Sequence, residues 1–267
     1  MRRLIRFSCA GDRLSGSLDE GARTVGLLCV TGGSQIRTGP HRMLHRIATA
    51  VAAAGVPVFR YDRRGVGDSE GVDPGFKDSG PDLAAAVSAF HAEAPHVATI
   101  VGFGLCDGAT TIALHGRAAG LDALTLANPW LVEAEPDTLA PAATRAHYRK
   151  RLLSPASWAE VARGNVDLLG AIRSIFGSVA AKEDRSLADE VAAGLAPYAG
   201  KLTLILSRND GTAIAARSCW NADAFDHVRD EKIVTVDTDS HTFARAGDLQ
   251  PVLASLIGFI DDVDQRL

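Results

Sequence analysis

Residues 102–108 read Gly-Phe-Gly-Leu-Cys-Asp-Gly and stand between an apolar run, 97–101, and an alanine-rich stretch. The apolar, partly β-branched run predicts a buried strand, and the alanine-rich stretch predicts a helix. Gly104 and Gly108 flank the cysteine and permit a sharp, strained turn between the two elements. The sequence therefore predicts a strand, a turn and a helix, with the Cys106 thiol lifted above the sheet.

The pattern Gly-x-Cys-x-Gly has the form of a nucleophile elbow, and the alternative interpretation is a buried cysteine in a glycine-rich turn. The order of residues along the chain favours the elbow. A candidate acid and a candidate histidine follow Cys106, each after the end of a further predicted strand. We therefore treat Cys106 as a candidate nucleophile.

Composition limits the classes of protein to be considered. A chain of 267 residues that is 46% hydrophobic can bury one large core, and we expect one catalytic domain with an insertion. The net charge of −4 provides no general attraction to nucleic acid, so we expect no nucleic-acid partner. No apolar stretch has the roughly 20 residues of a transmembrane helix, and no signal-peptide core is present.

The cysteines indicate neither a disulfide scaffold nor a metal site. They are widely spaced, without a CxxC pair or a Cys/His cluster. We expect a cytoplasmic, reducing setting that keeps Cys106 as a free thiol. The four positions are Cys9, Cys29, Cys106 and Cys219.

Strand and helix patterns alternate along most of the chain. Residues 4–8 and 14–18 predict an antiparallel hairpin, and later apolar runs predict buried parallel strands. Helical patterns between them predict an α/β fold, with a mostly parallel sheet of about eight strands and helices on both faces. The predicted later strands are 25–30, 56–61, 97–101, 121–127, 202–206 and 233–236, and the helices are 41–54, 79–93, 108–119, 212–226 and 247–262.

The interval 128–200 lacks a strand pattern and contains several helical stretches. Because it is too long for a plain loop and follows a strand, we expect a helical lid above the carboxyl ends of the strands. Residues 1–127 and 201–267 then form the core domain. The helical stretches are 141–153, 155–163, 166–176 and 186–195.

Three residues of this interval are candidates for substrate binding: Trp130, Trp158 and Arg149. The tryptophans suit an apolar pocket, although packing within the lid explains them equally well. Arg149 belongs to a basic cluster at 145–151, which suits a phosphate, coenzyme A or an acidic sugar. The alternative is the solvated face of an amphipathic helix.

A thiol nucleophile needs a base, and His241 follows the predicted strand 233–236 on a loop before the final helix. Its position favours it over the other seven histidines of the chain. Asp210 comes four residues after the strand 202–206 and is the candidate that orients the imidazole. Asp237 and Asp239 are rival acids, but they lie very close to the histidine in sequence.

An oxyanion hole needs backbone N–H donors. The turn Thr-Gly-Gly-Ser at 31–34 follows a strand, and we expect the first donor to be the N–H of Gly33, with Ser34 as the alternative. The second expected donor is the N–H of Asp107. An ordinary turn or a phosphate loop remains an alternative, although the turn lacks the Lys-Ser/Thr of a P-loop and the third glycine of a dinucleotide site.

Residues 61–69 read Tyr-Asp-Arg-Arg-Gly-Val-Gly-Asp-Ser and are similar to the D-x-R-G-x-G-x-S segment that follows the fourth strand in many α/β-hydrolases. Together with the elbow, Asp210 and His241, this segment gives the chain a resemblance to the α/β-hydrolase superfamily. The resemblance implies the α/β-hydrolase fold, and it implies that residues 62–69 brace the active-site loops.

A narrower resemblance rests on the Gly-Leu-Cys-Asp-Gly elbow, the Thr-Gly-Gly-Ser-Gln turn with residues 39–42, and the segment 148–155 with Trp158. These are similar to the exosortase A system-associated hydrolases, type 1, of bacteria that make exopolysaccharide. Cysteine replaces the usual serine nucleophile, as it does in dienelactone hydrolases.

The sequence thus predicts a cofactor-free, metal-free enzyme that acts on an ester or thioester of a small molecule or acylated carrier. A second nucleophile can capture an acyl-cysteine, so acyl transfer stands beside hydrolysis. The alternative is a catalytically silent α/β-hydrolase fold that serves as a scaffold or binding partner in the same pathway. Haloacid-type or peroxidase-type chemistry is disfavoured, because neither aspartate nor serine occupies the nucleophile position.

Overall fold

The computed structural model describes residues 1–132 and 186–266. Strands in this part form one eight-stranded sheet in the order β1-β2-β4-β3-β5-β6-β7-β8. The pairs β1–β2 and β2–β4 are antiparallel, and every other pair is parallel, so the expected sheet is confirmed. The strands are β1 (Arg2–Cys9), β2 (Asp12–Asp19), β3 (Val25–Val30), β4 (Val58–Asp62), β5 (Thr99–Leu105), β6 (Ala123–Ala127), β7 (Leu202–Ser207) and β8 (Lys232–Val236).

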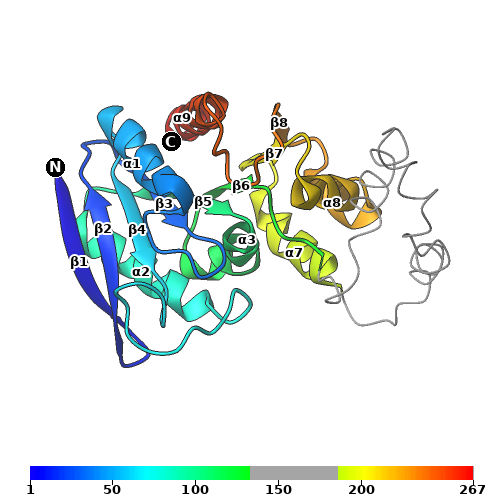
Figure 1. The fold of residues 1–267 in the computed structure, drawn as a ribbon. Helices are drawn as coiled ribbons and strands as arrows, with labels where there is room; N and C mark the ends of the chain where they lie inside the picture. Colours follow the sequence, from blue (N-terminus) through cyan, green and yellow to red (C-terminus); the bar gives the residue numbers. More distant parts are fainter. Residues whose placement is uncertain (133–185, 267) are drawn as a thin grey trace, which may run out of the picture.

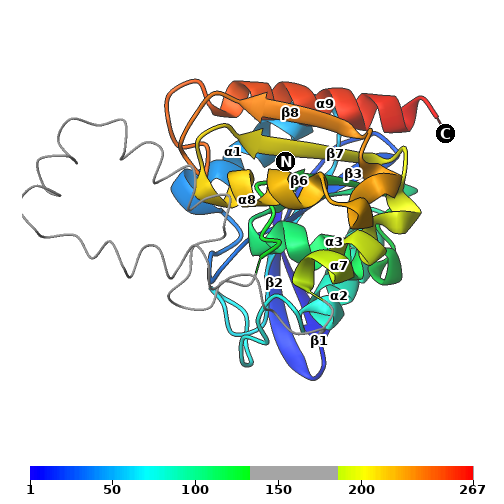
Figure 2. The same cartoon turned by 90° about the vertical axis from the view of Figure 1, so that its right-hand side faces the viewer.

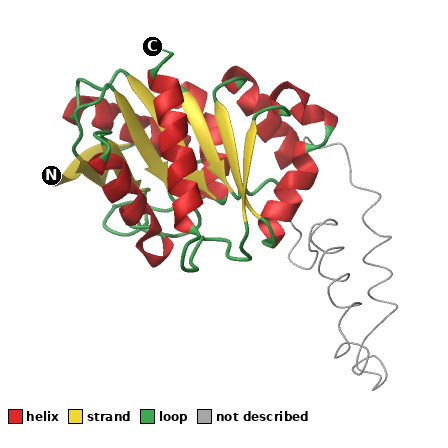
Figure 3. Ribbon diagram, turned by 90° about the horizontal axis from the view of Figure 1, so that it is seen from above, coloured by secondary structure: helices red, strands yellow, loops and turns green. Residues whose placement is uncertain are grey.

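Helices cover both faces of the sheet (Figures 1, 2 and 3). The helices α1 (Met43–Ala53) and α9 (Leu249–Asp264) pack on one face. The other face is covered by α2 (Gly80–Glu93), α3 (Asp107–Ala119), α7 (Leu187–Leu195) and α8 (Gly211–Trp220). Within the described residues, no helix is both long enough and apolar enough to cross a membrane.

The strand β3 shows why these runs are apolar throughout. Its side chains alternate between the faces: Val25, Leu27 and Cys29 join the core beneath α1 and α9, whereas Leu28 and Val30 join the core beneath α2 and α3. All six residues of β3 are buried. A strand covered on both faces is therefore a continuous apolar run instead of an alternating one.

Most predicted boundaries differ from the structure by one or two residues, and two elements differ more. The strand β5 continues to Leu105 instead of ending at residue 101, because its glycines serve close packing and do not end the strand. A Cβ atom on Gly102 would lie 2.6 Å from a methyl group of Leu121. The expected helix 212–226 is divided into α8 and a 3-10 helix, η4 (Asp223–Val228), because Ala222 between them is extended.

The helix α7 lies within the stretch that we expected to belong to the lid. Its buried side chains join the main core, and Gly194 lets α7 approach the backbone of α3 at Ala113. The structure thus packs α7 against the core helix α3. The remainder of the expected lid, residues 133–185 with Trp158 and Arg149, lies outside the described residues.

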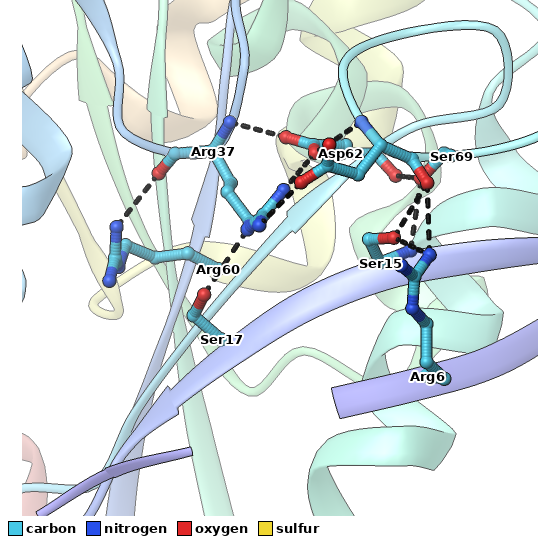
Figure 4. Close-up of polar contacts among 8 residues, drawn as sticks. Arg6, Ser15, Ser17, Arg37, Arg60, Asp62 and Ser69 are labelled. Atoms are coloured by element: carbon cyan, nitrogen blue, oxygen red, sulfur yellow. Dashed lines mark hydrogen bonds and ion pairs between the residues drawn. The ribbon is translucent and has the colours of Figure 1, made fainter. Parts of the chain in front are cut away.

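Asp62, at the end of β4, is the centre of a polar network (Figure 4). Its fully buried carboxylate accepts hydrogen bonds from the backbone N–H groups of Arg37 (2.5 Å) and Asp68 (3.1 Å) and forms an ion pair with the Arg37 guanidinium. The Ser69 hydroxyl donates to the Asp62 carbonyl at 2.6 Å. The network joins the turn after β4 to the loop after β3, which carries Gly33.

Candidate active site

Cys106 lies at the junction of β5 and α3, where the backbone is strained. Its φ of 58° and ψ of −127° are values that residues with a side chain rarely adopt. The Cys106 carbonyl accepts hydrogen bonds from the N–H groups of Ala109 (3.1 Å) and Trp130 (3.2 Å), which hold the turn in place. Cys106 is half-buried and lines a cavity.

Glycines allow the elbow to touch the loop that follows β3. A Cβ atom on Gly108 would lie 2.6 Å from the carbonyl oxygen of Thr31, and a Cβ atom on Gly32 would lie 2.5 Å from the carbonyl oxygen of Leu105. Both neighbours are backbone atoms that cannot rotate away. The pattern Gly-x-Cys-x-Gly therefore brings the candidate nucleophile and the expected oxyanion loop together.

We expect Gly108→Ala to destabilise the protein by about 1–3 kcal/mol, because the added methyl group overlaps the β3 backbone. Urea denaturation of the variant measures the loss. Gly258→Ala is the matched control, since Gly258 lies in α9 with no atom within 4 Å of its added Cβ. That variant should be as stable as the wild type or slightly more stable. Equal stability of Gly108→Ala and wild type would contradict the close contact.

His241 connects the candidate acid to the candidate nucleophile. The carboxylate Oδ2 of Asp210 lies 2.9 Å from Nδ1 of His241, and His241 and Cys106 line the same cavity. Asp210 begins α8, and the same oxygen accepts a hydrogen bond from the N–H of Ala213 at 2.9 Å. Burial lowers the pKa of His241, but the hydrogen bonds and charges of Asp210 and Cys106 outweigh burial and raise the pKa to about 10.

The two rival acids have other partners. Asp237 forms an ion pair with Arg208 at 2.9 Å, and Asp239 forms one with Arg245 at 2.6 Å. Both aspartates are exposed. Asp210 is therefore the acid that faces the His241 ring.

The raised pKa of His241 makes the stability of the protein depend on pH. The protonated ring stabilises the folded state fully below its unfolded pKa of about 6.5, and this contribution disappears as the pH rises through about 10. We expect the stability advantage of wild type over His241→Gln to shrink between pH 6 and pH 10. Urea denaturation at several pH values measures it.

His96→Gln is the control for this titration. His96 is exposed and precedes β5, at the end of the sheet opposite to Cys106, so its replacement should leave the pH profile unchanged. An advantage of wild type over His241→Gln that grew with pH would contradict the assigned sign.

Asn128 is a site residue that the sequence analysis missed. It is fully buried directly after β6, with a φ of 41°. Its amide group donates to the carbonyl oxygen of His241 (2.7 Å) and to Ser207 Oγ (3.0 Å), and its Oδ1 accepts from the N–H of Ser207 (2.8 Å). Asn128 thus ties the histidine loop to the end of β7. The available signal was an asparagine immediately after a buried strand.

One of the two expected oxyanion donors already has an acceptor in the structure. The N–H of Gly33 is close to the elbow, but it donates a hydrogen bond to Oδ1 of Asp107 at 2.6 Å. The N–H of Asp107 belongs to the first position of α3, where helical N–H groups have no acceptor within the helix. Ser34 is exposed in the turn and does not line the cavity beside Cys106.

A cavity of about 200 Å³ opens beside the thiol. Gly33, Cys106 and His241 are among the residues that line it, and Met43 and Leu44 contribute apolar side chains to the lining. Trp130 does not line this cavity; it packs against the main core, and its carbonyl accepts a hydrogen bond from the Thr110 hydroxyl. The full lining is Thr31, Gly32, Gly33, Gln35, Pro40, Met43, Leu44, Leu105, Cys106, His241 and Thr242.

Comparison with protein-family models and with curated proteins finds no match. Solved structures do match over almost the whole chain. An α/β-hydrolase from Penicillium, GrgF, is 18% identical, with a TM-score of 0.65 and 98% of each chain covered.

Two further matches have lower identity. An esterase from Pyrococcus furiosus is 14% identical with a TM-score of 0.64, covering 98% of this chain and 91% of its own. A dienelactone hydrolase from Anabaena variabilis is 14% identical with a TM-score of 0.63, covering 98% of this chain and 97% of its own. At these identities the similarity establishes the α/β-hydrolase fold.

Proposed function

We propose that the protein cleaves an ester or thioester bond, by hydrolysis or acyl transfer, through Cys106, His241 and Asp210. The observation that carries the proposal is the meeting of these side chains, which come from the ends of β5, β8 and β7. Asp210 Oδ2 lies 2.9 Å from His241 Nδ1, and His241 and Cys106 line the same cavity. The esterase and dienelactone hydrolase among the structural matches support ester chemistry.

The proposed reaction begins when Cys106 gives its thiol proton to His241 and the sulfur attacks the carbonyl carbon, which forms a tetrahedral oxyanion. The N–H groups of Gly33 and Asp107 are the proposed donors to this oxyanion. Protonated His241 then gives its proton to the leaving alcohol or thiol, and an acyl-cysteine remains. Water or another acceptor loses a proton to His241 and attacks the acyl group. The C–S bond of the second tetrahedral intermediate then breaks, which releases the product, and the sulfur takes the proton from His241 to become a thiol again. Each group is supplied by the chain, so the proposed reaction needs no cofactor.

The other cysteines are poor nucleophiles at neutral pH. Burial raises the pKa of Cys29 to about 12, and burial together with a hydrogen bond to Asp82 raises the pKa of Cys9 to about 11. Burial also raises the pKa of Cys219. A thiol that stays protonated reacts slowly with acyl groups, so these cysteines compete little with Cys106.

Intact-protein mass spectrometry tests the proposal. We expect a panel of esters and thioesters to leave one acyl group on the protein, located on Cys106 by peptide mapping. Lack of an adduct and of turnover across the panel would favour the silent scaffold instead. The resemblance to exosortase A system-associated hydrolases supports a substrate from a bacterial exopolysaccharide pathway, so acylated sugars and acylated carriers belong in the panel.

A further inference from the structure

The contact between Gly33 and Asp107 is the starting observation. The N–H of Gly33 lies 2.6 Å from Oδ1 of Asp107, across 74 positions of sequence. This separation is shorter than that of an ordinary amide hydrogen bond, and hydrogen bonds to a carboxylate are shorter than those to a neutral acceptor. The same carboxylate oxygen lies over Gly32, where an added Cβ would be 2.6 Å from it.

This contact competes with the proposed reaction, because one N–H group cannot serve two acceptors fully. An oxyanion hole requires its donor about 2.7–3.1 Å from the oxygen that develops charge. Oδ1 of Asp107 already occupies that position relative to Gly33. A carboxylate and an oxyanion also repel each other, so both cannot share the donor.

The side chain of Asp107 is free to leave. It is half-buried, and residues 33–36 beside it are exposed. In the part of the chain that the structure describes, no lysine, arginine or histidine forms an ion pair with Asp107. The carboxylate is thus held by Gly33 and by the partial positive charge at the start of α3.

We propose that the Asp107 carboxylate is an autoinhibitory latch: it blocks the N–H of Gly33 at rest, and a substrate reacts only after its carbonyl oxygen displaces the carboxylate. This inference rests on the proposed function, since it assigns the resting state of the proposed oxyanion hole. The latch slows every substrate by the same factor, because each must release the same hydrogen bond before the transition state forms.

Removal of the carboxylate is expected to accelerate the reaction. We expect Asp107→Ala to raise kcat/KM by about ten- to hundredfold, the range that corresponds to one hydrogen bond with a charged group. Asp107→Asn keeps the size of the side chain but offers a neutral, weaker acceptor, so a smaller rise is expected. The rise should be the same for acetyl and hexanoyl thioesters, whose acyl chains fill the cavity to different extents.

Two measurements separate the latch from a change in the pocket. A trifluoromethyl ketone adds to the Cys106 sulfur and forms an oxyanion, so its affinity should increase by a factor similar to that of kcat/KM in Asp107→Ala. In NMR spectra, the amide proton of Gly33 should move upfield in the same variant, because the short hydrogen bond is lost. The matched control is Asp230→Ala, which removes one exposed carboxylate far from the elbow.

Several results would overturn the latch. Unchanged or reduced kcat/KM in Asp107→Ala, with thermal unfolding close to that of wild type, would show that the contact positions the loop instead of blocking it. An unchanged Gly33 amide shift would show that the contact is absent in solution. Lack of a Cys106 adduct in both proteins would overturn the proposed function, whereas adducts that form at equal rates would overturn the latch alone.

Discussion

Cys106→Ala is expected to reduce kcat/KM by about 10⁴-fold or more on any ester or thioester that the wild type cleaves. The variant retains the cavity and the Asp210–His241 pair, but it has no atom that can form the acyl intermediate. Its stability should remain close to that of wild type, because the half-buried side chain loses only one sulfur atom. Steady-state kinetics and thermal unfolding of the purified variant measure both effects.

Cys106→Ser distinguishes loss of the nucleophile from loss of shape. A hydroxyl occupies the same position but forms an anion far less readily, so we expect activity between those of wild type and Cys106→Ala. Cys219→Ala is the matched control, since Cys219 is a half-buried cysteine on α8 that does not line the cavity. Wild-type turnover in both Cys106 variants would show that another residue attacks the carbonyl.

Asp62→Ala is expected to lower the free energy of unfolding by about 3–5 kcal/mol, because it leaves the Arg37 guanidinium without its buried partner. The change also removes the acceptor of two backbone N–H groups, those of Arg37 and Asp68. Urea denaturation measures the loss. Activity should fall as well, since the network holds the loop that carries Gly33 (Figure 4).

Asp68→Asn tests whether burial explains this effect. Asp68 pairs with the same arginine at 2.8 Å, but its side chain is 62% exposed. Exposed ion pairs contribute little to stability, so this variant should lose less than about 1 kcal/mol. Losses of similar size in the two variants would contradict the importance of the buried position.

Much of the fold was predictable because strand and helix patterns are local. The strand β3 coincides with the predicted run 25–30, since a strand buried on both faces is apolar throughout. The end of β5 was not predictable in the same way. Gly102 and Gly104 suggested a turn, but the structure shows that they make room for Leu121 and for the start of α3. Whether a glycine ends a strand or admits a neighbour depends on what packs against it.

The candidate site also contains residues that the sequence predicted and one that it did not. The order of the chain predicted Cys106, Asp210 and His241, because each follows a predicted strand, and parallel strands bring their carboxyl ends together at one edge. In the structure, Cys106 and His241 line one cavity, and the Asp210 carboxylate contacts the His241 ring. Asn128 escaped prediction, since its role depends on hydrogen bonds to the backbone of His241, 113 positions away.

The sequence by itself determined the elbow, the alternation of strands and helices, and the order of the candidate groups, because turn chemistry and periodicity are properties of neighbouring residues. Only the tertiary structure decided that Asp210 faces His241 while Asp237 pairs with Arg208. It also decided that Asp107 accepts a hydrogen bond from Gly33. These choices depend on distances of a few ångströms between segments remote in sequence, which arise only when the loops pack together above the sheet.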